Sequence, residues 1–165
     1  MELNLLPILN FEGRKMPFDV RLDMKNYPED TFRFLSPVKL QGKVINIGGG
    51  FFDLSAQGEV RVALTCDRCA ENFERDIAFS VEERLKKEET EAHEEDQEII
   101  AFTGNGIALD DLVYGSLFMS LPGKTLCRED CKGLCPICGK NLNLESCSCD
   151  TQTTDPRFDI LDQLL

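Results

Sequence analysis

Eight cysteines, six of them within residues 127–149, constrain this chain of 165 residues more than any other feature of its sequence. No apolar run approaches the roughly 18 residues that a membrane-spanning helix needs. The N-terminal residues MELNLLPILNFEGRK also lack the basic start, apolar stretch and small-residue cleavage site of a secretory signal. We therefore expect a cytoplasmic protein without a membrane partner, in which a reducing environment favours metal-bound thiolates over disulfides.

The last cysteines of the chain predict a tetrahedral zinc site. The run CPICG at residues 135–139 has the C-x2-C spacing that lets two thiolates converge on one ion, because its tight turn directs backbone N–H groups at the sulfurs. The run CSC at residues 147–149 supplies two more thiolates after a short return loop. The first expected ligand set is therefore Cys135, Cys138, Cys147 and Cys149.

The other four cysteines can form a second site. Cys66 and Cys69 have the C-x2-C spacing again, and Cys127 and Cys131 could close the site with the looser C-x3-C spacing. Two zinc ions would then use all eight thiols. The alternatives are one zinc with spare thiols, one ion shared between the first C-x2-C pair and the CPIC pair, a redox dithiol, and free buried thiols at Cys127 and Cys131.

No catalytic motif accompanies the cysteines. The sequence has no nucleophile elbow, P-loop or dinucleotide-binding fingerprint, and the GGG run at residues 48–50 is not followed by GK[ST]. A catalytic zinc keeps an open position and usually recruits histidine or a carboxylate, whereas the only histidine, His93, is surrounded by glutamates and is expected to be solvated. We expect structural zinc, no enzymatic activity and no small-molecule substrate.

Alternating apolar and polar residues predict an antiparallel sheet. The pattern covers residues 18–24, 38–47, 51–66 and 72–83, with Gly58 expected to interrupt the third strand, and it places Cys66 and Cys69 at a hairpin tip. Residues 98–102 read as a short strand, and residues 107–122 and 155–165 as helices. The predicted fold class is α+β: a mainly antiparallel sheet with a few helices and a C-terminal cysteine-rich zinc-binding lobe at residues 124–150, all within one domain spanning residues 1–165.

Charge is unevenly distributed along the chain. The formal net charge of −12 opposes non-specific binding to nucleic acid, which relies on Lys and Arg. Residues 82–98 carry nine acidic and three basic side chains and almost no apolar face, which predicts a mobile acidic insertion. Residues 124–157 carry five of each sign, so side-chain charge does not repel this segment from RNA.

The motifs of the second half resemble a known family. The run CDRC at residues 66–69, the run LCREDCKGLCPICGKNLN at 126–143 and the run DPRFDIL at 155–161 together are similar to the YceD (DUF177) family of large ribosomal RNA subunit accumulation proteins. The resemblance extends from Phe18 to Leu165 and is strongest from Leu121 to Cys149. It implies a non-enzymatic ribosome biogenesis factor that supports 23S rRNA accumulation and large-subunit assembly.

The resemblance also implies a partner, either precursor large-subunit rRNA or a ribosomal protein. The alternatives from other functional classes are a redox-responsive zinc–thiolate protein and a protein-interaction module without an RNA role. The cations expected to face RNA or another partner are Arg68, Lys124, Arg128, Lys132, Lys140 and Arg157.

Overall fold

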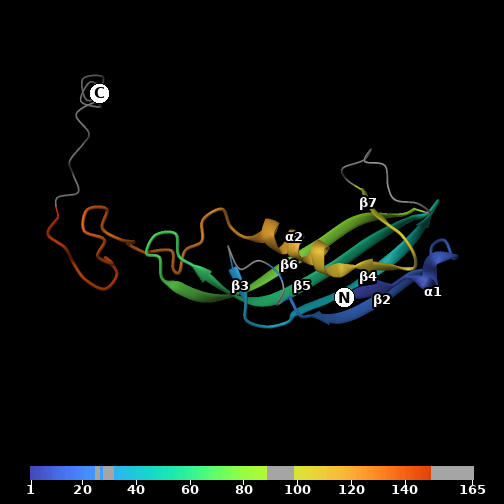
Figure 1. Cartoon of the computed structure of the whole chain (residues 1–165), viewed down its shortest axis with the longest axis horizontal. Helices are drawn as coiled ribbons and strands as arrows, with labels where there is room; N and C mark the ends of the chain where they lie inside the picture. The colour runs from blue at the N-terminus through green and yellow to red at the C-terminus, as the bar shows by residue number, and fades with distance from the viewer. Residues whose placement is uncertain (25–26, 28–31, 89–98, 150–165) are drawn as a thin grey trace, which may run out of the picture. The chain divides into compact units, whose positions relative to one another are not determined.

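The computed structural model describes residues 1–24, 27, 32–88 and 99–149, and Figure 1 shows the whole chain. Two compact units are present. The first comprises Met1–Leu64 and Glu74–Gly123, and the second comprises Thr65–Phe73 and the chain from Lys124 onward. Among the described residues, no helix is long and apolar enough to cross a membrane.

A six-stranded sheet forms the first unit, and it confirms the predicted α+β class. Five strands follow the order β2-β4-β5-β6-β7, while β3 pairs with β5. The ladders between β2 and β4, β4 and β5, and β3 and β5 are antiparallel, whereas β7 pairs with β6 in parallel. The strands are β2 (Lys15–Leu22), β3 (Phe32–Phe34), β4 (Val38–Gly48), β5 (Phe51–Thr65), β6 (Asn72–Lys87) and β7 (Ile99–Phe102).

The sheet forms because apolar residues alternate along its long strands and bury one face. Strand β5 buries every second side chain from Phe52 to Leu64, and Gly58 does not interrupt it. The prediction of a bend or bulge at Gly58 is therefore wrong. A Cβ atom there would clash with the ring of Phe79, so the glycine provides space for a neighbouring aromatic ring while the pairing with β4 continues regularly.

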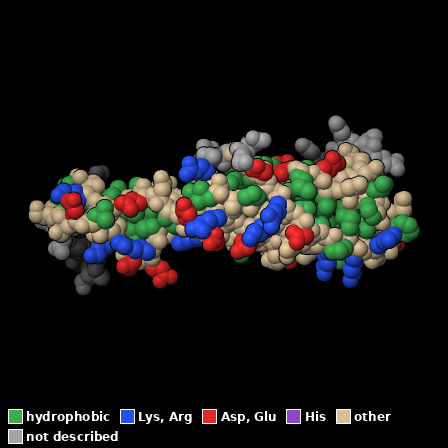
Figure 2. Space-filling view, turned by 90° about the horizontal axis from the view of Figure 1, so that it is seen from below, with side chains coloured by type: hydrophobic (Ala, Val, Ile, Leu, Met, Phe, Trp, Pro, Cys, Tyr) green, Lys and Arg blue, Asp and Glu red, His purple; other side chains and the backbone are tan. Residues whose placement is uncertain are grey.

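Ion pairs cross the exposed side of the sheet. Arg84 pairs with Asp53 at 2.9 Å, and Arg61 pairs with Glu74 at 3.0 Å. Figure 2 shows a face of the molecule on which basic and acidic side chains are interspersed, without a large area of either sign. This face has the mixed charge of an ordinary solvated surface.

Two helices and a small second sheet complete the described part of the first unit. Strand β1 (Glu2–Asn4) pairs with β8 (Gly106–Ala108), and helices α1 (Leu6–Leu9) and α2 (Leu109–Ser120) follow β1 and β8. The sequence pattern did not predict β1, β3, β8 or α1. The expected helix at residues 107–122 is confirmed in its central part, but it begins at Leu109 because the preceding residues pair with β1.

The predicted acidic insertion at residues 82–98 is wrong over its first part. Residues 82–87 belong to β6, because Leu85 is completely buried and Arg84 pairs across the sheet with Asp53. Residues 89–98, which include His93, lie outside the described residues, as does the helix expected at residues 155–165.

Candidate metal centres

The second unit contains two groups of four cysteines. In each group, all four Sγ atoms lie within 4.8 Å of one another. These are the two sets that the spacing suggested, and neither mixes the two C-x2-C pairs. We call them cluster 1, which consists of Cys66, Cys69, Cys127 and Cys131, and cluster 2, which consists of Cys135, Cys138, Cys147 and Cys149.

The sulfur spacing in cluster 1 fits one tetrahedral ion. The Sγ atoms of Cys66 and Cys131 are 3.8 Å apart, and those of Cys69 and Cys127 are 3.7 Å apart. Four thiolates at about 2.3 Å from a central ion would lie about 3.8 Å from one another. A disulfide would require about 2.0 Å. Cluster 1 therefore has the dimensions of a closed four-thiolate site, and each cluster could hold one metal ion.

The two C-x2-C turns have the same backbone geometry. In the first, the N–H of Ala70 donates to the carbonyl of Cys66 at 2.8 Å, and the N–H of Cys66 donates to the carbonyl of Glu71 at 2.9 Å. In the second, Gly139 donates to Cys135 at 2.9 Å, and Cys135 donates to Lys140 at 2.8 Å. The chain thus uses one local structure twice, 69 positions apart in the sequence.

A left-handed residue follows each of these turns. Gly139 has φ 72°, a conformation that costs glycine little. Its counterpart Ala70 has φ 57° and is the one non-glycine with positive φ among the described residues. An L-residue in this conformation costs roughly 1–2 kcal/mol. The fold around the turn at Cys66–Cys69 therefore stabilises Ala70 in a backbone conformation that alanine disfavours.

Backbone N–H groups stabilise one thiolate in each turn. Burial raises the pKa of Cys66, but N–H groups of Cys127, Cys69 and Arg68 outweigh it and lower the pKa to about 6. In cluster 2, N–H groups of Cys138 and Ile137 lower the pKa of Cys135 to about 6 despite its burial. Each turn supplies two of these donors from its own backbone, two and three residues after the cysteine, and Cys66 receives a further one from Cys127. Each turn therefore stabilises one cysteine in the thiolate form, which is the form that binds a metal ion.

The neighbouring sulfurs repel a second negative charge. Burial, together with hydrogen bonds to the sulfurs of cluster 1, raises the pKa of Cys127 to about 12. In cluster 2, the sulfur of Cys138 and then burial raise the pKa of Cys149 to about 12. Four thiolates cannot gather at this distance without a cation among them, which is the electrostatic reason why such clusters bind metal.

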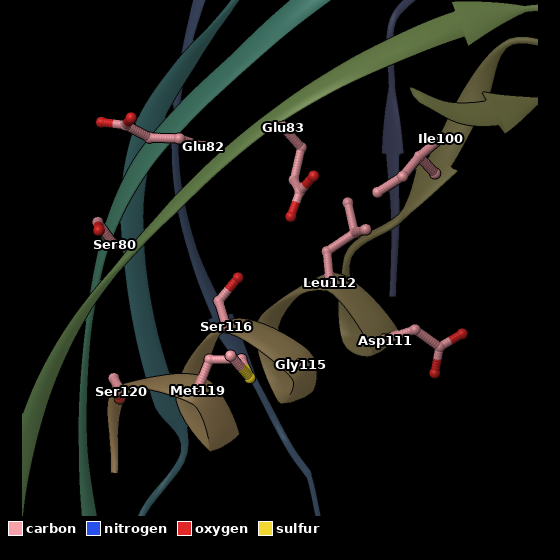
Figure 3. A pocket seen from close by; sticks show the side chains of 10 residues that line it. All are labelled: Ser80, Glu82, Glu83, Ile100, Asp111, Leu112, Gly115, Ser116, Met119 and Ser120. Atoms are coloured by element: carbon pink, nitrogen blue, oxygen red, sulfur yellow. The ribbon is translucent and has the colours of Figure 1, made fainter. Parts of the chain in front are cut away.

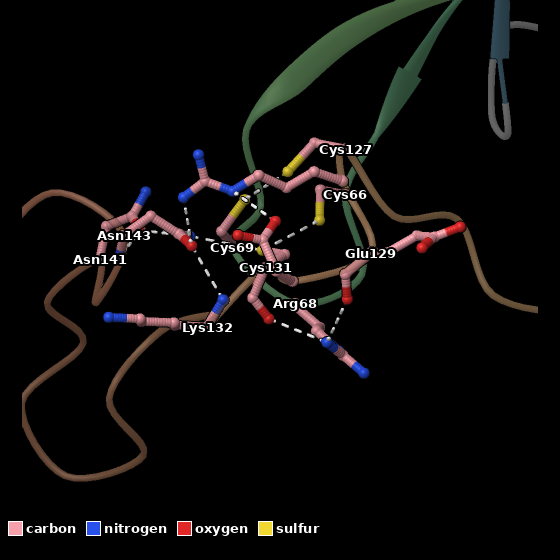
Figure 4. Close-up of polar contacts among 11 residues, drawn as sticks. Cys66, Arg68, Cys69, Cys127, Glu129, Cys131, Lys132, Asn141 and Asn143 are labelled. Carbon is pink, nitrogen blue, oxygen red and sulfur yellow. Dashed lines mark hydrogen bonds and ion pairs between the residues drawn. The ribbon is translucent and has the colours of Figure 1, made fainter.

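Arg68 connects the hairpin tip to the segment that carries Cys131 by hydrogen bonds, as Figure 4 shows. Its Nη1 donates to the carbonyl of Cys131 at 2.9 Å, and its own carbonyl accepts the N–H of Leu134 at 2.9 Å. Gly133 passes close to it, and a Cβ at that position would lie 2.9 Å from the Arg68 carbonyl oxygen. Gly133 also has φ 77°, so both space and backbone conformation require glycine there.

Two asparagines connect the clusters, and their roles were not predicted from the sequence. The Nδ2 of Asn143 donates to the Sγ of Cys131 at 3.3 Å and to the Oδ1 of Asn141 at 2.8 Å. The Nδ2 of Asn141 in turn donates to Glu71 at 2.9 Å. Both asparagines lie in the cluster 2 loop, between Cys138 and Cys147. An N-x-N pair between two ligand pairs was the available signal, because Asn side chains often fix loops by such hydrogen bonds.

The predicted partner-binding cations have different environments. Three of them are engaged: Arg68 binds backbone carbonyls, Arg128 pairs with Asp130 at 3.4 Å, and Lys140 pairs with Glu145 at 3.3 Å. Lys124 and Lys132 are exposed and have no side-chain partner within the described part of the unit. Arg157 lies outside the described residues.

Cluster 2 is more open to solvent than cluster 1. Cys135 is buried, but Cys138 is exposed and Cys147 and Cys149 are half-buried. An open cavity of about 380 Å³ adjoins these three thiols. In cluster 1, three of the four cysteines are buried.

Comparison with known proteins gives one match. No curated protein and no solved structure matches the chain. The family model YceD, described as large ribosomal RNA subunit accumulation protein, matches residues 54–165. This range covers more than half of the chain and contains every cysteine of both clusters. The chain therefore belongs to the YceD family of large ribosomal RNA subunit accumulation proteins.

Proposed function

We propose that this protein is a cytoplasmic, non-catalytic factor that supports 23S rRNA accumulation and large-subunit assembly, with zinc stabilising its second unit. The observation that carries the proposal is the family match over residues 54–165, which includes both clusters. The family is described by a role in accumulation of the large ribosomal RNA subunit, and this description names no reaction.

The composition of the second unit supports a structural role for the metal. Its buried described residues are four cysteines and Gly133. Apolar side chains that could form a core are instead exposed, among them Ile137 and Leu144. A segment with so little apolar burial folds only with an additional source of free energy, and metal binding supplies it in small zinc domains.

Zinc is the metal that the donor set fits best. Four thiolates with the spacing of a tetrahedral site are typical of structural zinc, and they leave no open position for a substrate. When bound, zinc would offset half of the thiolate charge of each cluster. Metal analysis of the purified chain should give two zinc ions, falling to one in Cys66→Ser and in Cys135→Ser. The control Ser146→Ala, which changes an exposed serine between ligands, should retain two.

The second unit also provides groups for contact with rRNA or a ribosomal protein. Lys124 and Lys132 are the exposed cations best placed to do so, because their charges are not neutralised by a described neighbour. Arg68, Arg128 and Lys140 present partly neutralised charge beside them. If RNA is bound here, Lys124→Glu with Lys132→Glu should weaken co-sedimentation with large-subunit precursors, whereas Lys43→Glu, on the sheet, should not.

Depletion tests the role itself. Loss of the protein should lower the ratio of 23S to 16S rRNA, and the wild-type chain should restore it. The chain with Cys66→Ser and Cys135→Ser should not restore the ratio, whereas Ser146→Ala should. An unchanged ratio after depletion, together with no association with precursor particles, contradicts the proposal.

The exposure of cluster 2 favours a second candidate function, a redox-responsive zinc–thiolate protein. Cys138 is the accessible thiol at which oxidation would begin. Mild peroxide should then release one zinc reversibly from cluster 2 before cluster 1 loses metal. Retention of both ions under these conditions excludes this function.

A further inference from the structure

A groove of about 570 Å³ runs between α2 and β6 in the first unit, and Figure 3 shows the side chains around it. It is separate in the sequence from both cysteine clusters and plays no part in the function proposed above. Its lining combines acidic, apolar and small polar residues: Ser80, Glu82, Glu83, Ile100, Asp111, Leu112, Gly115, Ser116, Met119 and Ser120.

The charged side chains that line the groove are acidic among the described residues. Glu82, Glu83 and Asp111 line it, and no described lysine or arginine does. Asp111 accepts a hydrogen bond from the hydroxyl of Tyr27 at 2.6 Å. Glu82 and Glu83 have no ion-pair partner in the described structure, and Figure 3 shows the Glu83 side chain directed toward α2. Because neighbouring residues of a strand point to opposite faces, the uncompensated carboxylate of Glu83 faces α2 across the groove, whereas that of Glu82 lies on the other side of the strand.

Apolar side chains accompany these carboxylates. Ile100 and Leu112 are half-buried in the lining, and Met119 is 82% exposed. Phe118, which precedes Met119 in α2, is also exposed. A ligand in the groove would therefore cover apolar surface at the same time as it meets the carboxylates.

A strand edge borders the groove. Strand β7 pairs only with Arg84–Lys87 of β6, and no described strand pairs with residues 76–83 on that side. Ser80, Glu82 and Glu83 belong to this part of β6 and also line the groove. An unpaired edge offers N–H and C=O groups to an incoming extended chain.

We propose that this groove docks an extended, basic segment of a partner protein, which adds to the β6 edge. A lysine or arginine side chain of the segment meets Glu83 on the side of α2, a second meets Glu82 on the opposite side of the edge, and apolar side chains pack on Leu112 and Met119. The carboxylates repel phosphates, so the charge favours a basic polypeptide over RNA. The proposal does not depend on the role in rRNA accumulation, although a basic ribosomal protein would satisfy both.

Photocrosslinking in cells tests the proposal. Benzoylphenylalanine in place of Met119 should capture a partner protein, and mapping of the crosslink should locate a segment with net positive charge. The same probe in place of Phe11, an exposed apolar side chain beside α1, should not capture this segment. A synthetic peptide with the captured sequence should bind the purified chain, with an affinity that falls as salt is raised.

Charge substitutions give the decisive comparison. Glu83→Lys should weaken binding of the peptide about tenfold, and Glu83→Gln should have a smaller effect in the same direction. Glu129→Lys makes the same charge change outside the groove and should leave binding unchanged. Capture of RNA, of an acidic segment or of a second copy of this chain overturns the proposal, as does the absence of any crosslink or an affinity insensitive to Glu83→Lys.

The two proposals can fail separately. If depletion leaves rRNA ratios unchanged but the basic segment still binds, the role in rRNA accumulation is wrong and the groove assignment stands. If rRNA ratios fall but the groove captures nothing basic, the groove assignment is wrong and the role in accumulation stands.

Discussion

Asn143 donates its side-chain N–H to the Sγ of Cys131 at 3.3 Å, although the asparagine belongs to the loop of cluster 2 and the cysteine to cluster 1. The same side chain accepts hydrogen bonds through its Oδ1 from the N–H of Lys132 at 2.8 Å and from Arg128 at 2.7 Å. It therefore fixes both the position of a ligand and the course of the chain beside it.

Asn143→Ala should lower the affinity of cluster 1 for zinc. Loss of a hydrogen bond to a ligand typically costs 10- to 100-fold in metal affinity, and we expect a change of about this size. Chelator competition on the Cys135→Ser chain would measure cluster 1 alone. Leu144→Ala, which changes an exposed residue of the same loop, is the control and should leave the affinity unchanged. Equal affinities in the two variants would show that the hydrogen bond does not support the ligand.

Ala70→Gly should stabilise the chain. Ala70 has φ 57°, so glycine would relieve a conformational cost of roughly 1 kcal/mol, partly offset by the greater freedom of glycine in the unfolded chain. Gly139→Ala should destabilise the equivalent turn, since Gly139 has φ 72°. Chemical denaturation of the zinc-loaded proteins would compare both with the wild type. Destabilisation by Ala70→Gly would contradict the equivalence of the two turns.

Zinc removal should unfold the second unit before the first. Hydrogen exchange after chelation should show loss of protection at residues 65–73 and 124–149, because their buried side chains are mainly the ligands themselves. Amides in β4 and β5 should remain protected, since these strands carry the apolar core. Full protection of residues 124–149 without metal would show that the unit folds by packing alone.

Tyr27 provides a pH test of its own contact with α2. Burial and then the hydrogen bond to Asp111 raise the pKa of Tyr27 above its ordinary value of about 10. A raised folded-state pKa means that the contribution to stability is present below about pH 10 and is lost as the pH rises through the folded-state pKa.

Ultraviolet titration should therefore detect one of the two tyrosines ionising at abnormally high pH. Asp111→Asn should move that transition toward the ordinary range, because it removes the carboxylate. Asp53→Asn, far from both tyrosines in the sequence, should leave it in place. A transition that does not respond to Asp111→Asn would contradict the assigned cause.

Local sequence patterns predicted the long strands and the main helix. Period-two alternation directly reports burial of one sheet face, as in β4 and β5, and the stripe of Leu109, Val113 and Leu117 reports the buried face of α2. Val81 and Leu85 continue the alternating strand pattern, but the glutamates between them also fit an acidic insertion. The end of β6 was therefore predicted to be part of that insertion. Pairing of β1 with β8 connects residues about a hundred positions apart and leaves no local pattern.

Cysteine spacing indicated the same two groups that the structure brings together, because a C-x2-C turn determines its own geometry. It could not reveal Asn143 or Glu71, whose roles arise only when the hairpin tip and the cluster 2 loop come together in space. Arg68 and Arg128 were predicted to face RNA or another partner on the basis of their charge alone. Their carbonyl and asparagine contacts show that part of that charge supports the fold of the metal-binding unit.

The two clusters close chain loops of very different length. Cys69 and Cys127 are 58 positions apart, so an ion in cluster 1 would act as a cross-link around β6, β7 and α2. A disulfide closing a loop of that length would contribute about 4 kcal/mol by restricting the unfolded chain. An ion in cluster 2 would enclose only its own short loop. Metal loss at cluster 1 would thus release the topological constraint on β6 and β7, two of the six strands of the sheet, whereas loss at cluster 2 would have a local effect.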